Sequence, residues 1–271
     1  MSKSLRLYLA VSFGFLMLAI LSIPTPATEV NVDITGKIEG YPEYLYFDNI
    51  TNGTYEHIYT EWMNSGSVSC KVKIRADILK DDAVVYTGWS QEKIMLPGAY
   101  DTFDIYWLPK EDGNYHVVLT AYQCYESKKI KEINFSAIGT NKTRASLEDI
   151  AGISISNTKD MIRINVKKKR GVESLPPLVV IPSQYPMGWY FESKKLEPTQ
   201  DKIIDTISYY AEYWKEEPIT LEIVSEDGKY YAKKTIRLKE PRDVTPLYAV
   251  VGFVIGVIVV KKLNKRPKRR D

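Results

Sequence analysis

Residues 67–80 read SVSCKVKIRADILK, and their alternation decides the fold class. Apolar side chains occupy every second position: Val68, Cys70, Val72, Ile74, Ala76 and Ile78. Polar and charged side chains fill the positions between them. This period of two indicates a strand with one buried and one solvated face, as in an antiparallel sandwich sheet. The turn sequences Asn64-Ser65-Gly66 and Asp81-Asp82 bound it on either side.

The flanking sequence predicts more strands of the same kind, from Val30 to Ile34 and at residues 84–89, 102–108, 115–121 and 130–135. Short strands separated by turns every eight to twelve residues or so are typical of a β-sandwich. We therefore expect a first β-sandwich module at residues 28–137.

A sequence around a tyrosine, Asp112-Gly113-Asn114-Tyr115, resembles the tyrosine corner of immunoglobulin-like domains. In such a corner the tyrosine begins the penultimate strand and its hydroxyl bonds back to the preceding loop. The segments NSGSVSCKVKIRADIL (64–79), VVYTGWS (84–90), LPGAYDTFDIYWLP (96–109) and DGNYHVVLTAY (112–122) look like the CARDB type of immunoglobulin-like (fibronectin-III-like) module of bacterial and archaeal surface proteins. The resemblance implies an adhesion or spacer module without catalytic machinery.

A linker at residues 138–149 and a second, more divergent β-sandwich at residues 150–240 are expected next. Residues 162–166 alternate, and the turn Glu226-Asp227-Gly228 lies between two strand-like runs that predict a hairpin. Residues 203–214 fit either a strand or a helix. No direct sequence repeat relates the two modules.

Both ends of the chain carry membrane signals. Residues 1–27 combine Lys3 and Arg6 with an apolar run and small residues, which indicates a signal peptide or, alternatively, an N-terminal anchor. Residues 244–260 are uncharged and long enough to span a thin bilayer as a helix. The basic tail at residues 261–271 is then cytoplasmic. The predicted architecture is all-β, with two immunoglobulin-like sandwiches in tandem and a C-terminal transmembrane helix.

Charge and composition restrict the partners. The net charge is +3, but the leader and above all the tail are basic, so the exported part is mildly acidic. An acidic ectodomain argues against nucleic acid. The lipid bilayer, a protein at the surface or in the membrane, and a glycan are the candidate partners. Abundant lysine and glutamate with little glutamine favour an archaeal, hyperthermophilic source.

The sequence contains two cysteines, Cys70 and Cys124, and leaves undecided whether they form a disulfide. Export favours pairing. In immunoglobulin topology, however, the two strands concerned run in the same direction, and Cys124 lies far beyond the usual cysteine position. The Cα atoms would then be further apart than the ~7 Å that a disulfide allows.

Four Asn-x-Ser/Thr sequons make Asn49, Asn52, Asn134 and Asn141 glycosylation candidates.

No residue pattern predicts catalysis, a metal site or a cofactor, so an enzyme is not expected. His57 and His116, the two histidines, lie outside any metal-ligand spacing and are expected on the surface. Asp81-Asp82 and Glu111-Asp112 are turn residues. The densest aromatic cluster, Tyr209, Tyr210 and Trp214, is the candidate binding surface, with burial in the core as the alternative.

The function predicted is that of a membrane-anchored, extracytoplasmic structural, adhesive or protein-binding surface protein. The alternative is a single-span accessory subunit of a larger membrane complex. Gly252 and Gly256 are four residues apart on one helix face, which would let a partner helix approach closely, although glycine is also common in membrane spans.

Overall fold

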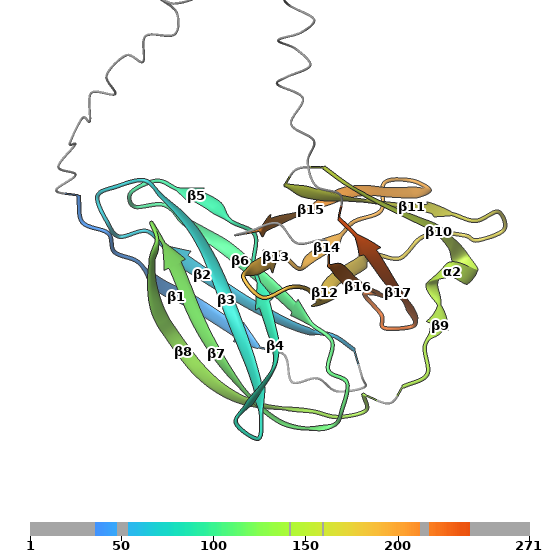
Figure 1. The fold of residues 1–271 in the computed structure, drawn as a ribbon, viewed down its shortest axis with the longest axis horizontal. Helices are drawn as coiled ribbons and strands as arrows, with labels where there is room; N and C mark the ends of the chain where they lie inside the picture. The colour runs from blue at the N-terminus through green and yellow to red at the C-terminus, as the bar shows by residue number, and fades with distance from the viewer. Residues whose placement is uncertain (1–35, 48–53, 141, 159, 212–216, 239–271) are drawn as a thin grey trace, which may run out of the picture. The chain divides into compact units, whose positions relative to one another are not determined.

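The computed structural model describes residues 36–47, 54–140, 142–158, 160–211 and 217–238, and about two thirds of them, 66%, belong to strands (Figure 1). The sheets are antiparallel apart from one two-residue pair, and they stack as sandwiches. All of these sheets belong to one compact unit that begins at Lys37. Within the described ranges no helix is long and apolar enough to cross a membrane. The predicted leader, the strand at Val30, the span and the tail lie outside these ranges.

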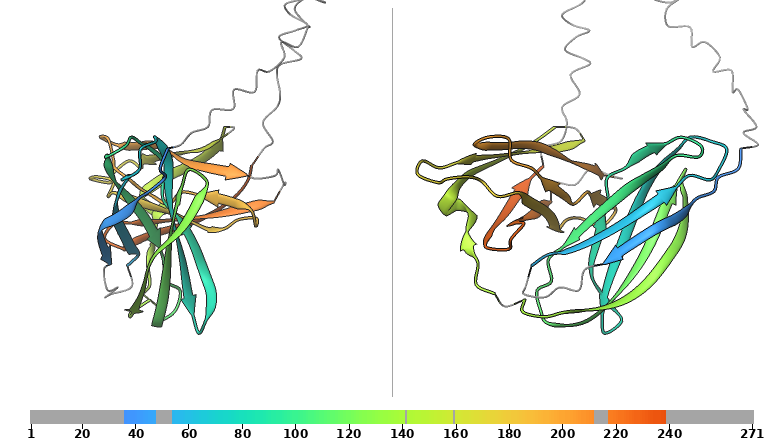
Figure 2. Two further views of the ribbon diagram at one scale, coloured as in Figure 1. Left: turned by 90° about the vertical axis from the view of Figure 1, so that its left-hand side faces the viewer. Right: turned by 180° about the vertical axis from the view of Figure 1, so that it is seen from behind.

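The first sandwich has two layers around one core, as Figures 1 and 2 show. One layer pairs β1 (Tyr41–Phe47), β2 (Glu56–Met63) and β6 (Tyr100–Trp107) in that order. The other pairs β4 (Ala83–Trp89), β3 (Cys70–Lys80), β7 (Gly113–Gln123) and β8 (Glu126–Ala137), with β5 (Lys93–Met95) also on β3. Trp62, Ile74 and Phe103 are among the buried side chains that fill the space between the layers.

The second sandwich also has two layers around a core of its own. One layer pairs β10 (Ala151–Asn157), β11 (Met161–Lys168), β15 (Lys202–Ala211) and β13 (Trp189–Phe191). The other pairs β14 (Lys194–Leu196), β12 (Leu178–Gln184), β16 (Pro218–Ser225), β17 (Tyr230–Arg237) and β9 (Ala145–Ser146). The single turn α2 (Leu147–Ile150) follows β9. The ambiguous residues 203–211 are therefore strand.

The two sandwiches repeat one topology, a relation that the sequence did not reveal. β1-β2-β6 matches β10-β11-β15, and β3-β7-β8 matches β12-β16-β17. Each copy also holds the same ion pair. Lys93 Nζ lies 2.7 Å from Asp101 Oδ1 and donates to Thr102 O, as Lys194 does to Asp205 Oδ1 (2.8 Å) and Thr206 O. The matching contacts tie a short strand to the opposite layer in both sandwiches.

An apolar seam joins the sandwiches. Tyr106 and Leu108 of the first pack with Val179, Ile181 and Val224 of the second. β12 and β16 are consequently buried on both faces, one against their own core and one against this seam. The seam explains why the middle of the second sandwich reads as continuous hydrophobic runs rather than as alternation.

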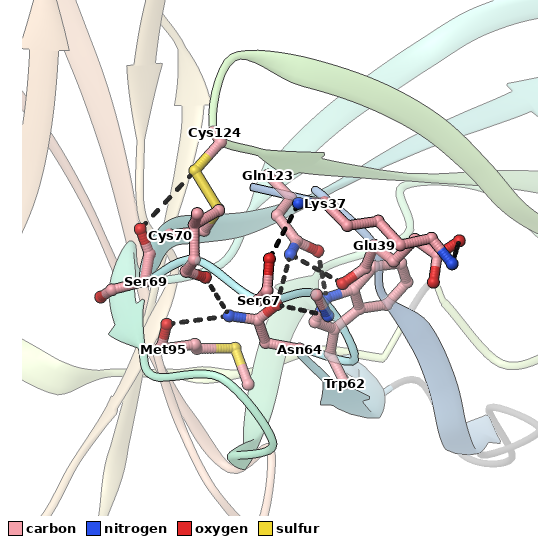
Figure 3. Close-up of a disulfide and its surroundings, with 12 residues drawn as sticks. Lys37, Glu39, Trp62, Asn64, Ser67, Ser69, Cys70, Met95, Gln123 and Cys124 are labelled. Atoms are coloured by element: carbon pink, nitrogen blue, oxygen red, sulfur yellow. Dashed lines mark hydrogen bonds and ion pairs between the residues drawn. A yellow bond between two sulfur atoms is a disulfide. The ribbon is translucent and has the colours of Figure 1, made fainter. Parts of the chain in front are cut away.

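Cys70 and Cys124 form a disulfide, with their Cα atoms 5.0 Å apart (Figure 3). The topological argument against this bond was wrong because it placed the two strands parallel. β3 and β7 are antiparallel neighbours with Val72 opposite Gln123, so the start of one strand lies beside the end of the other. Cys124 N also donates to Lys71 O at 3.1 Å.

A buried polar network lies next to the disulfide (Figure 3). Trp62 Nε1 donates to Gln123 Oε1 at 3.0 Å, and Gln123 Nε2 donates to Asn64 Oδ1 at 2.9 Å. Asn64 Nδ2 in turn donates to Met95 O at 3.1 Å. A Cβ atom at Gly40 would lie 2.3 Å from Gln123 Oε1, so only glycine fits there. The network connects both layers at the end of the sandwich that the disulfide closes.

The tyrosine at residue 115 makes the hydrogen bond expected of a tyrosine corner. Its hydroxyl donates to Glu111 O at 2.6 Å, and its ring is buried against Trp107 and Phe135. Asp112 Oδ1 accepts from the backbone N–H of Thr140 at 2.7 Å, which fixes the same loop.

Candidate binding surface

The outer side of the β1-β2-β6 layer is rich in tyrosine. The register places Tyr46 opposite Tyr59, and places Tyr41 and Tyr100 on either side of Met63. A bulge between Pro42 and Tyr44 shifts the alternation, so Tyr41, Tyr44 and Tyr46 all point outward. We call the outward group Tyr41, Tyr44, Tyr46, Tyr59 and Tyr100 the tyrosine face; Figure 2 (right) views this layer from its outer side.

Contacts between neighbouring rings and polar groups order the tyrosine face. Tyr44 and Tyr59 meet edge to face with centroids 6.1 Å apart. Tyr59 also meets the ring of His57, which stacks on Tyr106 at 4.7 Å and lies 2.7 Å from Asp104 Oδ1. These contacts position the rings of Tyr44 and Tyr59, although Tyr44 remains 53% exposed.

The tyrosine face is acidic as well as aromatic. β1, β2 and β6 contain no lysine or arginine, although the chain has 37 such residues. Glu61 and Asp104 are on the outward side, and Glu43 is at the bulge. Tyr59 donates its hydroxyl to Glu61 Oε1 at 2.8 Å, and this bond raises the pKa of Tyr59 to about 12. The face therefore carries the formal negative charge of its carboxylates.

A second feature is a cleft of about 410 Å³ beside the disulfide. Tyr122, Tyr125, Lys71, Lys73 and Glu92 line it together with Ser69 and Cys124. Lys73 Nζ lies 3.7 Å from the ring centroid of Tyr190 in the second sandwich, and burial lowers the pKa of Lys73. This cation–π contact crosses between the sandwiches and holds the wall of the cleft in place.

No protein-family model and no curated protein matches this chain. A functional assignment therefore depends on the surfaces themselves. Of these, the tyrosine face has the larger exposed aromatic area, because Tyr41, Tyr44, Tyr46 and Tyr100 are each more than two-fifths exposed.

The aromatic cluster predicted from the sequence is divided by the structure. Tyr209 is buried in the second core, where it stacks on Phe191 and Trp189, so its prediction as a binding residue was wrong. Tyr210 has the opposite parity on β15, is 54% exposed and stacks on Tyr190 at 5.5 Å. Trp214 lies outside the described residues.

The histidines and sequons have different surroundings. His57 was expected as a solvated surface residue, but it is half-buried and stacked on Tyr106. His116 Nδ1 lies 2.8 Å from Oδ1 of Asn134, an exposed residue in the middle of β8. The remaining predicted positions lie outside the described residues: Asn49, Asn52, Asn141, Gly252 and Gly256. In the part of the chain that the structure describes, no group of three or more His, Cys, Asp or Glu could hold a metal ion.

Sequence reasoning missed the tyrosine face. The signal available was the spacing of Tyr41, Tyr44 and Tyr46, but a spacing of three followed by two fits no regular strand without a bulge. The high tyrosine count pointed to strands in general and not to one surface.

Proposed function

We propose that this protein is a membrane-anchored, extracytoplasmic surface protein without catalytic activity that binds a protein partner through the tyrosine face. In this proposal its two sandwiches are immunoglobulin-like modules, the first of the CARDB type, residues 244–260 anchor them, and the basic tail is cytoplasmic. The Tyr115 corner bond supports the immunoglobulin-like class. The disulfide supports an exported location, because such bonds persist in oxidising compartments.

The tyrosine face is the observation that carries the binding proposal. Tyrosine supplies a large, rigid contact area at a low cost in side-chain entropy, and its hydroxyl can hydrogen-bond at a wet interface. The face is acidic and free of lysine and arginine, which fits a partner surface that carries those residues. Exposed tyrosine rings also attract such cations directly.

Replacing Tyr44 and Tyr46 by serine in the full chain is expected to weaken partner binding by at least about tenfold, because exposed aromatic anchors dominate interface energies. The measurement is quantitative affinity capture from gently solubilised native membranes, followed by mass spectrometry. Capture by the unaltered protein should also fall with added salt, since the attraction is partly between opposite charges.

The matched control is Tyr125→Ser, which removes a fully exposed tyrosine away from the face. Retained capture by the Tyr44/Tyr46 variant would refute the proposal, provided its melting temperature is unchanged. Loss of capture only in a Gly252→Ile, Gly256→Ile variant would instead favour an accessory subunit that docks through its membrane helix.

A further inference from the structure

Among the described residues, no strand pairs with the outer edge of β10. This strand lies at the end of its layer, and its seven residues carry no charge and no proline. Three of the other described edges, those of β8, β1 and β4, are protected in ways typical of soluble sheets. β8 carries Lys128, Lys129 and Lys131, and β1 has Pro42 and a bulge. Uncharged β4 is covered, because Tyr185 and Ser193 of the second sandwich donate to its carbonyl groups at Thr87 and Trp89.

The backbone groups at this free edge can be assigned from the ladder. Lys169 N donates to Ile150 O at 2.9 Å, and Thr158 N donates to Met161 O at 2.8 Å. Hydrogen-bonded and non-hydrogen-bonded pairs alternate in an antiparallel ladder. Gly152, Ser154 and Ser156 therefore bond to β11, and the N–H and C=O groups of Ile153 and Ile155 point away from it.

The central residues of β10, Ile153-Ser154-Ile155, read the same in both directions about Ser154. We propose that β10 pairs antiparallel with β10 of a second copy of this chain, with the two-fold axis at Ser154. Ile153 of one copy then lies opposite Ile155 of the other, so the outward backbone groups of both residues meet in register. Both isoleucine side chains are only half-buried, and pairing continues their apolar layer across the junction.

The two-fold axis gives a specific test, because Ser154 must face itself at a Cα separation of about 4.5 Å. Full-length chains in detergent, all carrying Gly252→Ile and Gly256→Ile to remove helix pairing, are labelled with donor or acceptor dyes at the C-terminus. Energy transfer between copies then reports association. Ser154→Lys alone, or Ser154→Glu alone, is expected to weaken association several-fold by like-charge repulsion.

Mixing the Ser154→Lys and Ser154→Glu chains is expected to restore association to at least the level of the serine protein. Ser208→Lys on β15, an interior strand of the same layer, is the control and should have no effect. The rescue distinguishes self-pairing from misfolding, since a misfolded Ser154→Lys chain would not regain association when the Ser154→Glu chain is added. The proposal would be overturned if chains that keep Ser154 stay monomeric. It would also be overturned if the Ser154 variants associate as strongly as the serine protein and mixing them has no effect. Binding of the edge to a different protein alone would overturn it too.

Discussion

Replacing Cys70 and Cys124 by serine is expected to lower the free energy of unfolding by about 4 kcal/mol. The bond closes a loop with a sequence separation of 54, and loop-closure entropy in the unfolded chain gives about this value. It also fixes the Cys124-Tyr125 turn, where both residues have a positive φ without being glycine. Urea unfolding of the full chain in detergent, followed by tryptophan fluorescence, measures the loss.

Reduction of the unaltered protein is the control and should reproduce the loss seen in the double variant. Asn64, Gln123 and Trp62 still connect the layers next to the disulfide, so the reduced protein is expected to fold, with a lower midpoint. An unchanged midpoint after complete reduction would show that the cross-link does not restrict the unfolded chain.

Ile181→Asp is expected to cost about 3–5 kcal/mol, because it leaves a charge buried without a partner. Ile181 is 1% exposed in the seam between the sandwiches, and the residue opposite it on β16, Glu222, is already ion-paired with Lys110. A second carboxylate beside Glu222 competes with it for this one lysine, which adds like-charge repulsion to the cost of burial. Urea unfolding measured by fluorescence and by circular dichroism gives the change.

The matched control is Ile204→Asp, which places the same charge on β15 where Ile204 is 44% exposed. Its effect should stay within about 1 kcal/mol, as for surface substitutions in general. Equal effects of the two substitutions would mean that the seam does not exclude water, and that the sandwiches are not stabilised by their contact.

Some strands could be predicted from the sequence because their inward positions are all apolar. β3 is the best case: its buried residues are Cys70, Val72, Ile74, Ala76 and Ile78. β2 was missed because Glu56 and Thr60 are also inward and buried, so its alternation is not one of apolar and polar residues. β1 was missed because of its bulge and proline.

Relations between strands could not be predicted, because they depend on topology. The disulfide became possible only when β3 and β7 were known to be antiparallel neighbours. The internal repeat was hidden by a change of spacing, since Asp101 follows Pro97 by four residues whereas Asp205 follows Pro198 by seven. On β15, alternation separates Tyr209 from Tyr210 but does not say which of them is buried.

The most direct test of the proposed surface location is lysine labelling of intact cells with a reagent that does not cross membranes, read out by mass spectrometry. We expect labelling of exposed Lys129 and Lys131 on β8, and labelling of Lys261, Lys262 and Lys265 in the tail only after the cells are permeabilised. Labelling of the tail in intact cells, or protection of the β8 lysines until permeabilisation, would contradict the proposed topology.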